Sequence, residues 1–291
     1  MTLILHQSDL QSWARCPQAW HLERQGAPRR QLSATAFGTV VHHALHAGAA
    51  EGNDVQVAID TFDWYWHPLH IGALTEPVDT WLPGESHAAL QDRGRDTIRK
   101  FFDLVRFDEA EVLALEFEFA VPMDGVVDPM DGSTVVLAGT VDRLVARRAK
   151  GHPEVGLDDL KTGRKKTHLR HNPQGTAYCY ASTLPQFWQG NPAMHTDGFG
   201  ADGTNLYLRF ASHARRFTWI DLKGGATWSD GGYRGPGDYA RLKYAAQQLA
   251  NSIRAEIFPL TMQGDVCTFC DVRASCAGIG LDDKDGDPRG R

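Results

Sequence analysis

The chain has 291 residues, of which 42% are hydrophobic and 23% are charged. This length and composition predict a globular protein with a buried core, and they exclude collagen-like and heptad-repeat fibres. The 30 basic and 36 acidic side chains give a net charge of −6. That charge excludes a uniformly basic coat for nucleic acid, although it leaves room for a local basic channel.

The sequence has no apolar run of the ~18 residues that a membrane span requires. Residues 1–8 also lack the basic region and the long apolar stretch of a secretory signal. We therefore expect a cytoplasmic protein with no membrane partner. Its five cysteines are too few for a disulfide-stapled fold, and in a reducing compartment clustered cysteines favour a metal or catalytic site.

The first part of the chain is predicted to be helical. Ser8 is expected to cap a helical segment whose apolar side includes Leu10, Trp13 and Trp20. Apolar residues then recur at helical spacing in three further segments, which we expect to be helices over 36–46, 55–65 and 85–105. Residues 68–84 are expected to form a loop.

The middle of the chain changes to a two-residue period, which indicates strands. In residues 112–121, four apolar side chains alternate with polar ones, and Glu116 and Glu118 fall on the opposite, solvent-facing side. Further strands are expected over 134–146, 155–160, 205–210 and 216–222, with turns or loops over 122–132 and 186–204. Helices are expected over 173–182 and 238–257, and the charged residues 282–291 are expected to be disordered. Helices flanking a central group of strands predict an α/β or α+β fold.

Two neighbouring predicted strands end in carboxylates, Asp142 and Asp159. Asp159 and Lys161 are two residues apart, so their side chains share one face of the strand. Two carboxylates can bind a hard divalent ion that activates water, and a lysine beside them can orient that water or offset developing negative charge. An isolated Asp-x-Lys is more often a solvated strand end, and Asp142 strengthens the pattern only modestly.

The order of motifs adds to this pattern. Asp142 and Asp159-x-Lys161 are followed by Gln174-x-x-x-Tyr178 and preceded by Gly38-x-x-x-His42. This order resembles the RecB-like branch of the PD-(D/E)XK nuclease superfamily. Residues 10–17 and the acids Glu116 and Glu118 also resemble the corresponding parts of these nucleases. The resemblance extends over residues 10–276.

The resemblance implies a central mixed β-sheet flanked by helices in one nuclease domain over 1–281. Within it, we expect a helical part over about 1–106, a catalytic core over about 107–222 and a C-terminal helix and cluster segment over about 236–277. It implies catalytic roles for Asp142, Asp159, Lys161, Gln174 and Tyr178, the last two holding the substrate backbone and the attacking water. It implies magnesium or manganese bound by His42, Asp142, Asp159 and the backbone carbonyl of Leu160.

Four cysteines form a second constellation: Cys267-x-x-Cys270, then Cys276, and the distant Cys16. Their thiolates suit zinc and an iron–sulfur cluster equally well. The resemblance to AddB-type and CRISPR-associated exonucleases implies a 4Fe–4S cluster, which would join the N- and C-terminal segments. The fifth cysteine, Cys179, is expected to be a small buried hydrophobic residue.

Two features are candidates for contact with DNA. The basic residues Arg164, Lys165, Lys166 and Arg170 follow the Asp-x-Lys strand and are expected to contact phosphates, although a solvated loop would have the same composition. The aromatic residues Trp64, Tyr65, Trp66 and Trp81 could stack bases of a single strand, but core packing explains them at least as well.

The resemblance implies a metal-dependent DNA nuclease, expected to be an exonuclease acting on DNA ends or single strands in recombination, repair or CRISPR or phage DNA processing. Helicase, recombination or CRISPR proteins are the expected partners, since the chain has no phosphate-binding loop of a helicase motor. The alternative is a non-catalytic DNA-binding or assembly module of the same fold, which would have no need of Asp142, Asp159 and Lys161. A zinc deaminase is disfavoured because Val266 stands where that signature needs proline.

Overall fold

A computed structural model describes residues 2–29, 31–82, 84–106, 110–149, 151–162, 172–189, 203–222, 227–261, 266–267 and 270–276. The four basic residues Arg164, Lys165, Lys166 and Arg170 lie outside the described residues, as does the charged tail 282–291. The predicted phosphate contacts of these basic residues and the predicted disorder of the tail therefore stay predictions.

In the described part of the chain, six strands form one mixed sheet. They are β1 (Ile4–His6), β2 (Glu111–Val127), β3 (Thr134–Ala149), β4 (His152–Lys161), β5 (Ala214–Asp221) and β6 (Thr227–Tyr233). The order is β1-β3-β4-β5-β6, and β2 pairs with β3. The pairs β1–β3 and β4–β5 are parallel, whereas β2–β3, β3–β4 and β5–β6 are antiparallel. The predicted mixed sheet is therefore confirmed.

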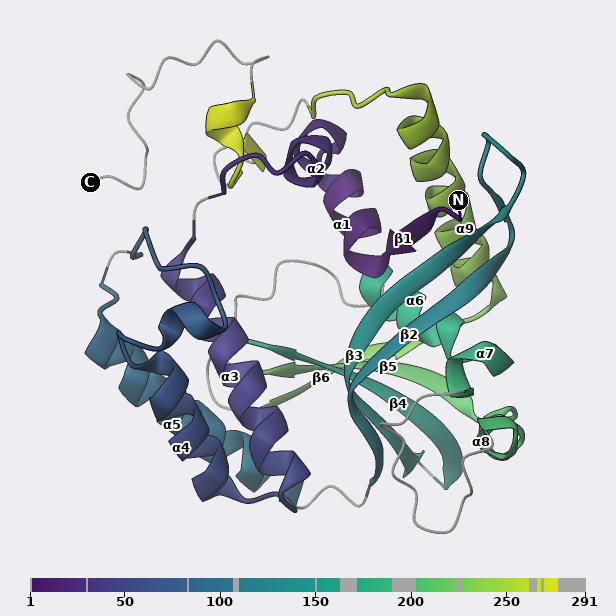
Figure 1. Ribbon diagram of the computed structural model, residues 1–291. Coiled ribbons are helices and arrows are strands. Elements are labelled where there is room, and N and C mark those ends of the chain that lie inside the picture. Colours follow the sequence, from purple (N-terminus) through teal and green to yellow (C-terminus); the bar gives the residue numbers. More distant parts are fainter. Residues whose placement is uncertain are drawn as a thin grey trace.

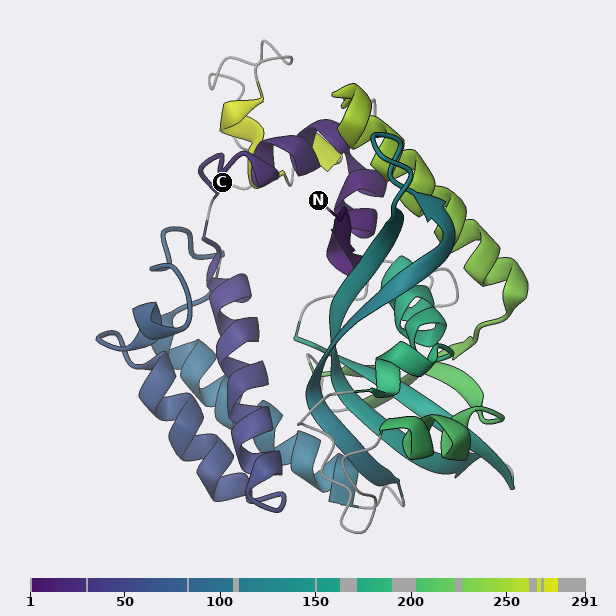
Figure 2. The same ribbon diagram turned by 45° about the vertical axis from the view of Figure 1, so that its right-hand side comes forward.

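Helices cover the sheet on two sides (Figures 1 and 2). Their apolar side chains form two main hydrophobic cores. The first core contains residues from α1 (Gln7–Arg15), α2 (Pro17–Arg24), α6 (Pro173–Ala181), α7 (Pro185–Trp188), α8 (Gly203–Phe210) and α9 (Pro236–Ala255). The second contains residues from α3 (Ser33–Ala50), α4 (Val55–Trp66) and α5 (His87–Arg106), together with Leu160 of β4, Ile220 of β5 and Leu222 just after β5. Burial of apolar side chains on both faces of the sheet is the main stabilising term in such a layered fold.

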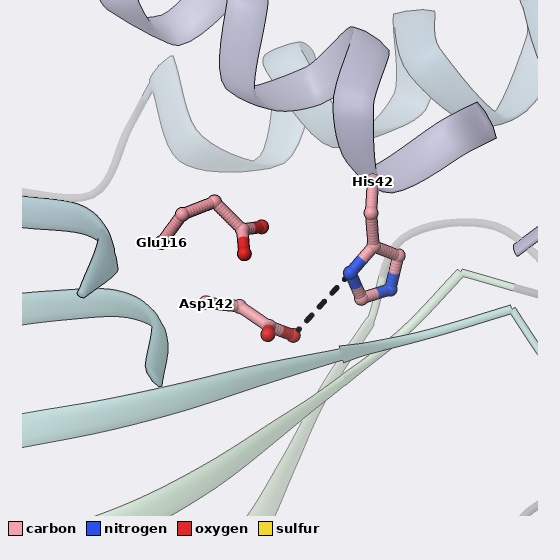
Figure 3. A group of neighbouring side chains, drawn as sticks. All are labelled: His42, Glu116 and Asp142. Atoms are coloured by element: carbon pink, nitrogen blue, oxygen red, sulfur yellow. Dashed lines mark ion pairs between the residues drawn. The ribbon is translucent and has the colours of Figure 1, made fainter. Parts of the chain in front are cut away.

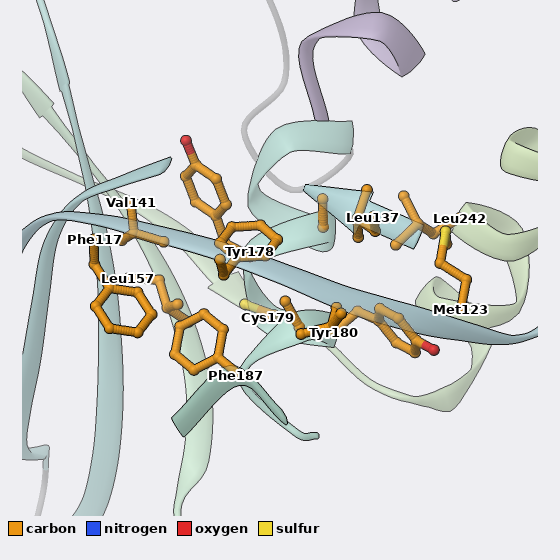
Figure 4. Close-up of a cluster of buried hydrophobic side chains, with 14 of the residues drawn as sticks. Phe117, Met123, Leu137, Val141, Leu157, Tyr178, Cys179, Tyr180, Phe187 and Leu242 are labelled. Atoms are coloured by element: carbon orange, nitrogen blue, oxygen red, sulfur yellow. The ribbon is translucent and has the colours of Figure 1, made fainter. Parts of the chain in front are cut away.

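The first core fixes the position of α6 on the sheet. Figure 4 shows Tyr178, Cys179 and Tyr180 of this helix among side chains from β2, β3, β4 and α9. Gly175 allows the close approach, because a Cβ atom there would lie 2.4 Å from the ring of Phe217 on β5. Cys179 is fully buried in this core, which confirms its predicted role as a small hydrophobic residue.

The register of β3 and β4 sets the position of the two predicted catalytic aspartates. Arg143 pairs with Asp158 at the end of the paired region of the two strands, so the adjacent residues Asp142 and Asp159 meet just beyond it. The backbone amide of Leu160 donates a hydrogen bond to Asp142 Oδ2 at 2.7 Å, which ties β4 to β3 at this point.

The predicted strand over 205–210 is wrong, because this segment belongs to helix α8. The apolar residues Leu206, Leu208 and Phe210 alternate with other residues, which is typical of a strand. The buried side chains, however, are Leu206 and Phe210, four residues apart, while Leu208 is 66% exposed. A helix buries that spacing on one face, and a strand would bury alternate residues instead.

The N-terminal helix also differs from its prediction. It begins at Gln7 and not after Ser8, since the Asp9 carboxylate accepts a hydrogen bond from the backbone amide of His6 at 2.7 Å. The helical segment is interrupted at Cys16, and Pro17 starts α2 at a position where its missing N–H costs nothing.

Three strand segments were not predicted from the sequence. They are β1, β6 and the extension of β2 through residues 122–127, which was expected to be turn. The other predicted helices and strands correspond to observed elements with shifted ends. Within the described residues, no helix has the length and apolar character to cross a bilayer.

Candidate active site

Asp159 lies at the centre of the polar groups that gather at the end of β4. Its side chain is fully buried, and Oδ1 accepts hydrogen bonds from Lys161 Nζ and Gln174 Nε2, each at 2.9 Å. Its other oxygen, Oδ2, is buried without a hydrogen-bond partner. Burial raises the pKa of Asp159 to about 6, against the lowering effect of the Lys161 cation. An unpartnered buried carboxylate oxygen is costly to the fold, and a bound cation would satisfy it.

Lys161 remains a cation in this setting. Burial lowers the pKa of its ammonium group, but the charges of Asp159 and Asp142 outweigh that effect and leave the pKa above its usual value. Its side chain is 32% exposed, so the charge is also accessible from solvent. The predicted common face of Asp159 and Lys161 is confirmed by their direct contact.

Asp142, His42 and Glu116 approach one another from β3, α3 and β2 (Figure 3). His42 Nδ1 lies 3.6 Å from Asp142 Oδ2. One potential ligand atom from each of the three residues lies within 4.8 Å of the others. Within the described residues no other trio of His, Cys, Asp or Glu meets this distance, and Asp159 lies beside this trio and not within it.

Glu116 was interpreted from the sequence as a solvated acid, and this interpretation is wrong. It is partly buried and faces Asp142, and burial together with the Asp142 charge raises its pKa to about 7. Its backbone adopts φ 46°, a left-handed conformation that non-glycine residues rarely take within a strand. The alternation of β2 is intact here, since Leu115 pairs with Arg143 and Phe117 with Val141. The polar side of the strand therefore faces Asp142 and His42 instead of solvent.

The position of His42 depends on the close approach of α3 to the end of β4. Gly38 makes this approach possible, because a Cβ atom at this position would lie 2.9 Å from Thr162 Oγ1. His42 follows one helical turn later on the same side of α3. Burial lowers the pKa of His42 to about 4, with a further contribution from Lys161, so its imidazole is neutral and able to act as a nitrogen ligand.

Gln174 and Tyr178 lie one turn apart on α6, where Asn172 caps the helix by accepting a hydrogen bond from the Gln174 amide. Gln174 Nε2 is 2.7 Å from the Tyr178 hydroxyl as well as 2.9 Å from Asp159. Both side chains are buried, Tyr178 almost completely, and burial raises the pKa of Tyr178 well above its usual value. The sequence correctly predicts a common face for the pair, and the structure shows that this face contacts Asp159.

A cavity of about 480 Å³ opens beside the trio. Its walls comprise Gly38, Thr39, His42, His43, His46, Leu74 and Glu116. Two of the three residues of the trio, His42 and Glu116, therefore contact a space large enough for a small molecule or a nucleotide.

The donor atoms fit a hard divalent ion. Two carboxylates and one imidazole come together, with the Asp159 carboxylate beside them, and oxygen ligands with a single nitrogen are suited to magnesium or manganese. The predicted ligands His42 and Asp142 are brought together directly, and Asp159 contributes an unpartnered oxygen nearby. Leu160 is placed by its amide bond to Asp142, and its backbone also forms a hydrogen bond with His42.

The predicted iron–sulfur cysteines are brought together in part. Cys16, at the junction of α1 and α2, shares a small buried cluster with Cys270 and Val272. Cys267 and Cys276 lie in the same C-terminal segment and are half-buried. None of the four thiols forms a disulfide, and the hydrophobic contact of Cys16 with Cys270 and Val272 brings the C-terminal segment against the α1–α2 junction.

A mixed sheet flanked by helices, with acidic strand ends, a cationic lysine and a neutral histidine at one edge, defines a metal-dependent hydrolase. The sequence matches the PD-(D/E)XK nuclease superfamily over residues 5–277, and the chain belongs to that superfamily. Membership implies metal-dependent hydrolysis of phosphodiester bonds. No curated protein sequence matches the chain.

Proposed function

We propose that this chain is a magnesium- or manganese-dependent deoxyribonuclease of the RecB-like branch that acts on DNA ends or single strands. The observation that carries the proposal is the Asp159 carboxylate, whose Oδ1 is held by Lys161 and Gln174 while Oδ2 is buried without a partner. This arrangement presents one oxygen toward a cation and one toward a fixed positive charge, as hydrolysis of a phosphodiester requires.

His42, Glu116, Asp142 and Asp159 are the side chains that would hold the ion, with the Leu160 carbonyl as a further ligand. When bound, a divalent cation lowers the pKa of a coordinated water and offsets negative charge on the phosphate. In its absence, burial raises the pKa of Glu116, Asp142 and Asp159, and the Asp142 charge adds to this effect at Glu116 and Asp159. Binding is therefore coupled to loss of protons from these groups.

The other residues position and stabilise. Lys161 keeps its proton and offsets the charge that develops on the phosphate oxygens, or orients the water through its ammonium group. Gln174 holds the Asp159 carboxylate in one orientation, and the Tyr178 hydroxyl accepts a second hydrogen bond from the Gln174 side-chain amide, which fixes the position of that amide. Arg164, Lys165, Lys166 and Arg170 are proposed to contact phosphates of the substrate.

We further propose that Cys16, Cys267, Cys270 and Cys276 hold a 4Fe–4S cluster that joins the C-terminal segment to the α1–α2 junction. The buried contact between Cys16 and Cys270 supports it. When bound, the cluster would close a chain loop that spans most of the protein, which stabilises the fold by restricting the unfolded chain. Partner proteins with a helicase motor, or proteins of recombination or CRISPR processing, are proposed to supply the DNA.

The test is degradation of end-labelled linear and circular DNA, single- and double-stranded, with magnesium, manganese or excess EDTA. We expect cleavage of linear single strands or ends with either metal and none with EDTA. A Lys161→Ala protein prepared in parallel should lose at least about 100-fold in rate, which excludes a contaminating nuclease. DNA binding without cleavage under all conditions would instead favour the non-catalytic module.

A further inference from the structure

A row of aromatic and imidazole rings runs along α3 and α4 from the cavity to the surface. The His43 and Tyr65 rings have centroids 4.7 Å apart, Tyr65 and Trp64 are 4.6 Å apart, and Trp64 stacks on His70 at 4.1 Å. We call His43, Tyr65, Trp64 and His70 the ring track. Each ring touches the next, so the track is continuous.

The ring track begins in the cavity of the candidate active site. His43 lines that cavity together with His42 and Glu116. The chain segment that carries His70 continues through the short helix η1 (Ile71–Ala73) to Leu74, which forms another part of the cavity wall. The segment from His70 to Leu74 therefore joins the outer end of the ring track to the cavity wall. A strand that leaves the cavity would pass along this segment.

The exposure of the tryptophans separates the ring track from the hydrophobic core. Trp66 is fully buried in the core of the α3–α5 bundle, whereas Trp64 is 50% exposed although it lies on the same helix. The His70 ring is held against Trp64 by a 3.0 Å hydrogen bond between its Nδ1 and the Trp64 carbonyl. The exposed indole is thus fixed in orientation before any ligand arrives, which reduces the entropy lost on binding.

The charge of this region favours contact with bases over contact with phosphates. Residues 31–92 contain no lysine or arginine and carry several acids, and the neighbouring Arg93 and Arg95 of α5 are paired with Glu85 and Asp63. Phosphate groups gain little there, while stacking of bases on aromatic rings needs no positive charge and tolerates any sequence. A double helix keeps its bases stacked internally, so only an unpaired strand offers free base faces.

We propose that the ring track binds unpaired bases of a single DNA strand that continues from the active site, with Trp64 as the main stacking residue. This inference rests on the proposed nuclease function for the position of the strand. Among the substrates proposed above, it favours an unpaired strand or a frayed end over a duplex, and it names the residues that would make this selection.

The test is binding in EDTA, so that no cleavage occurs. Dissociation constants would be measured for a labelled oligothymidylate, for an abasic strand of the same length and for a duplex. The proteins are the wild type, Trp64→Leu, and Trp81→Leu as the matched control, since Trp81 is 40% exposed on the same bundle but contacts Trp66 instead of the ring track. His70→Ala is the second variant, in case Trp64→Leu fails to fold.

We expect Trp64→Leu to weaken binding of the oligothymidylate by at least about fivefold, as loss of one stacked base predicts. Trp64→Leu should bind the abasic strand as tightly as the wild type does. Its slope of log affinity against log salt concentration should also match that of the wild type, because no phosphate contact is lost. An equal loss on the abasic strand, an equal loss in Trp81→Leu, or unchanged binding in both Trp64→Leu and His70→Ala would overturn the inference.

The outcome is independent of cleavage. A protein that degrades DNA with metal but binds it equally well without Trp64 would retain the nuclease function and refute the ring track. A protein that binds through Trp64 but never cleaves would retain the ring track and refute the nuclease function.

Discussion

The side-chain amide of Gln174 donates a hydrogen bond to Asp159 Oδ1 at 2.9 Å, while Oδ2 of the same carboxylate is buried without a partner. Gln174 therefore determines which Asp159 oxygen is free. From the sequence alone, Gln174 would hold the substrate and leave metal binding unchanged; its contact with Asp159 alters that expectation. Gln174→Ala should lower both manganese affinity and single-turnover cleavage by about 10- to 100-fold, as loss of a group that orients a ligand does.

The measurement combines calorimetric titration with manganese and single-turnover cleavage. Gln56→Ala is the matched control, because the Gln56 side-chain amide likewise donates a hydrogen bond to an aspartate, Asp60, but on the exposed side of α4. Reduced cleavage with wild-type manganese affinity would return Gln174 to a role in holding the substrate.

Asp159→Asn should abolish cleavage and stabilise the metal-free protein at pH 8. The raised pKa of Asp159 means that burial disfavours its charged form, which predominates at that pH, and an amide removes the charge without changing the volume. Thermal unfolding in EDTA and cleavage with magnesium would be measured on the same preparation. Wild-type cleavage, or a lower melting temperature at pH 8, would contradict the assignment.

Much of the candidate site could be predicted from local sequence. The two-residue spacing of Asp159 and Lys161 and the four-residue spacing of Gln174 and Tyr178 each place side chains on one face of an element. These faces depend only on the local secondary structure. The contact of Lys161 with Asp159 follows from their spacing on β4, and the contact of Gln174 with Asp159 also needs the packing of α6 on the sheet.

Glu116 could not be assigned in this way. The alternation of its strand places it on the polar side, and the pairing of β2 with β3 sets it opposite Asp142, where His42 of α3 also lies close. The one available signal was the pair of acids on the strand before Asp142. Short strands such as β1 were missed for a related reason: three residues carry too little periodicity, and their pairing depends on distant parts of the chain.

The cysteine constellation predicts an iron protein with a brown colour and about four irons per chain. Cys16→Ser and Cys270→Ser should lose the iron and lower the melting temperature, because Cys16 and Cys270 lie in the buried contact between the chain ends. Cys179→Ser should keep the iron, since Cys179 lies in the separate core around α6. Elemental analysis and the visible spectrum decide it, and one zinc per chain without iron would refute the cluster while keeping the junction.

Glu116 should make the metal-free protein less stable as the pH rises. Its pKa is about 7 in the folded protein, above the ordinary value of 4.5, so its contribution to stability is full below pH 4.5 and is lost as the pH rises through 7. His42 acts in the opposite sense, because its pKa of about 4 makes stability fall as the pH drops from 6.5 toward 4.

The wild-type curve of stability against pH therefore mixes the two effects, and the difference between wild type and Glu116→Gln isolates the carboxyl group. In thermal unfolding with EDTA, the variant should gain in melting temperature relative to wild type between pH 5 and 8. With manganese the order should reverse at pH 8, since the ion binds the ionised carboxylate and stabilises only the protein that has it. Glu51→Gln, at an exposed glutamate after α3, is the control and should follow the wild type at every pH. A constant difference between wild type and Glu116→Gln across this range, with no reversal by manganese, would show that Glu116 is not part of the metal site.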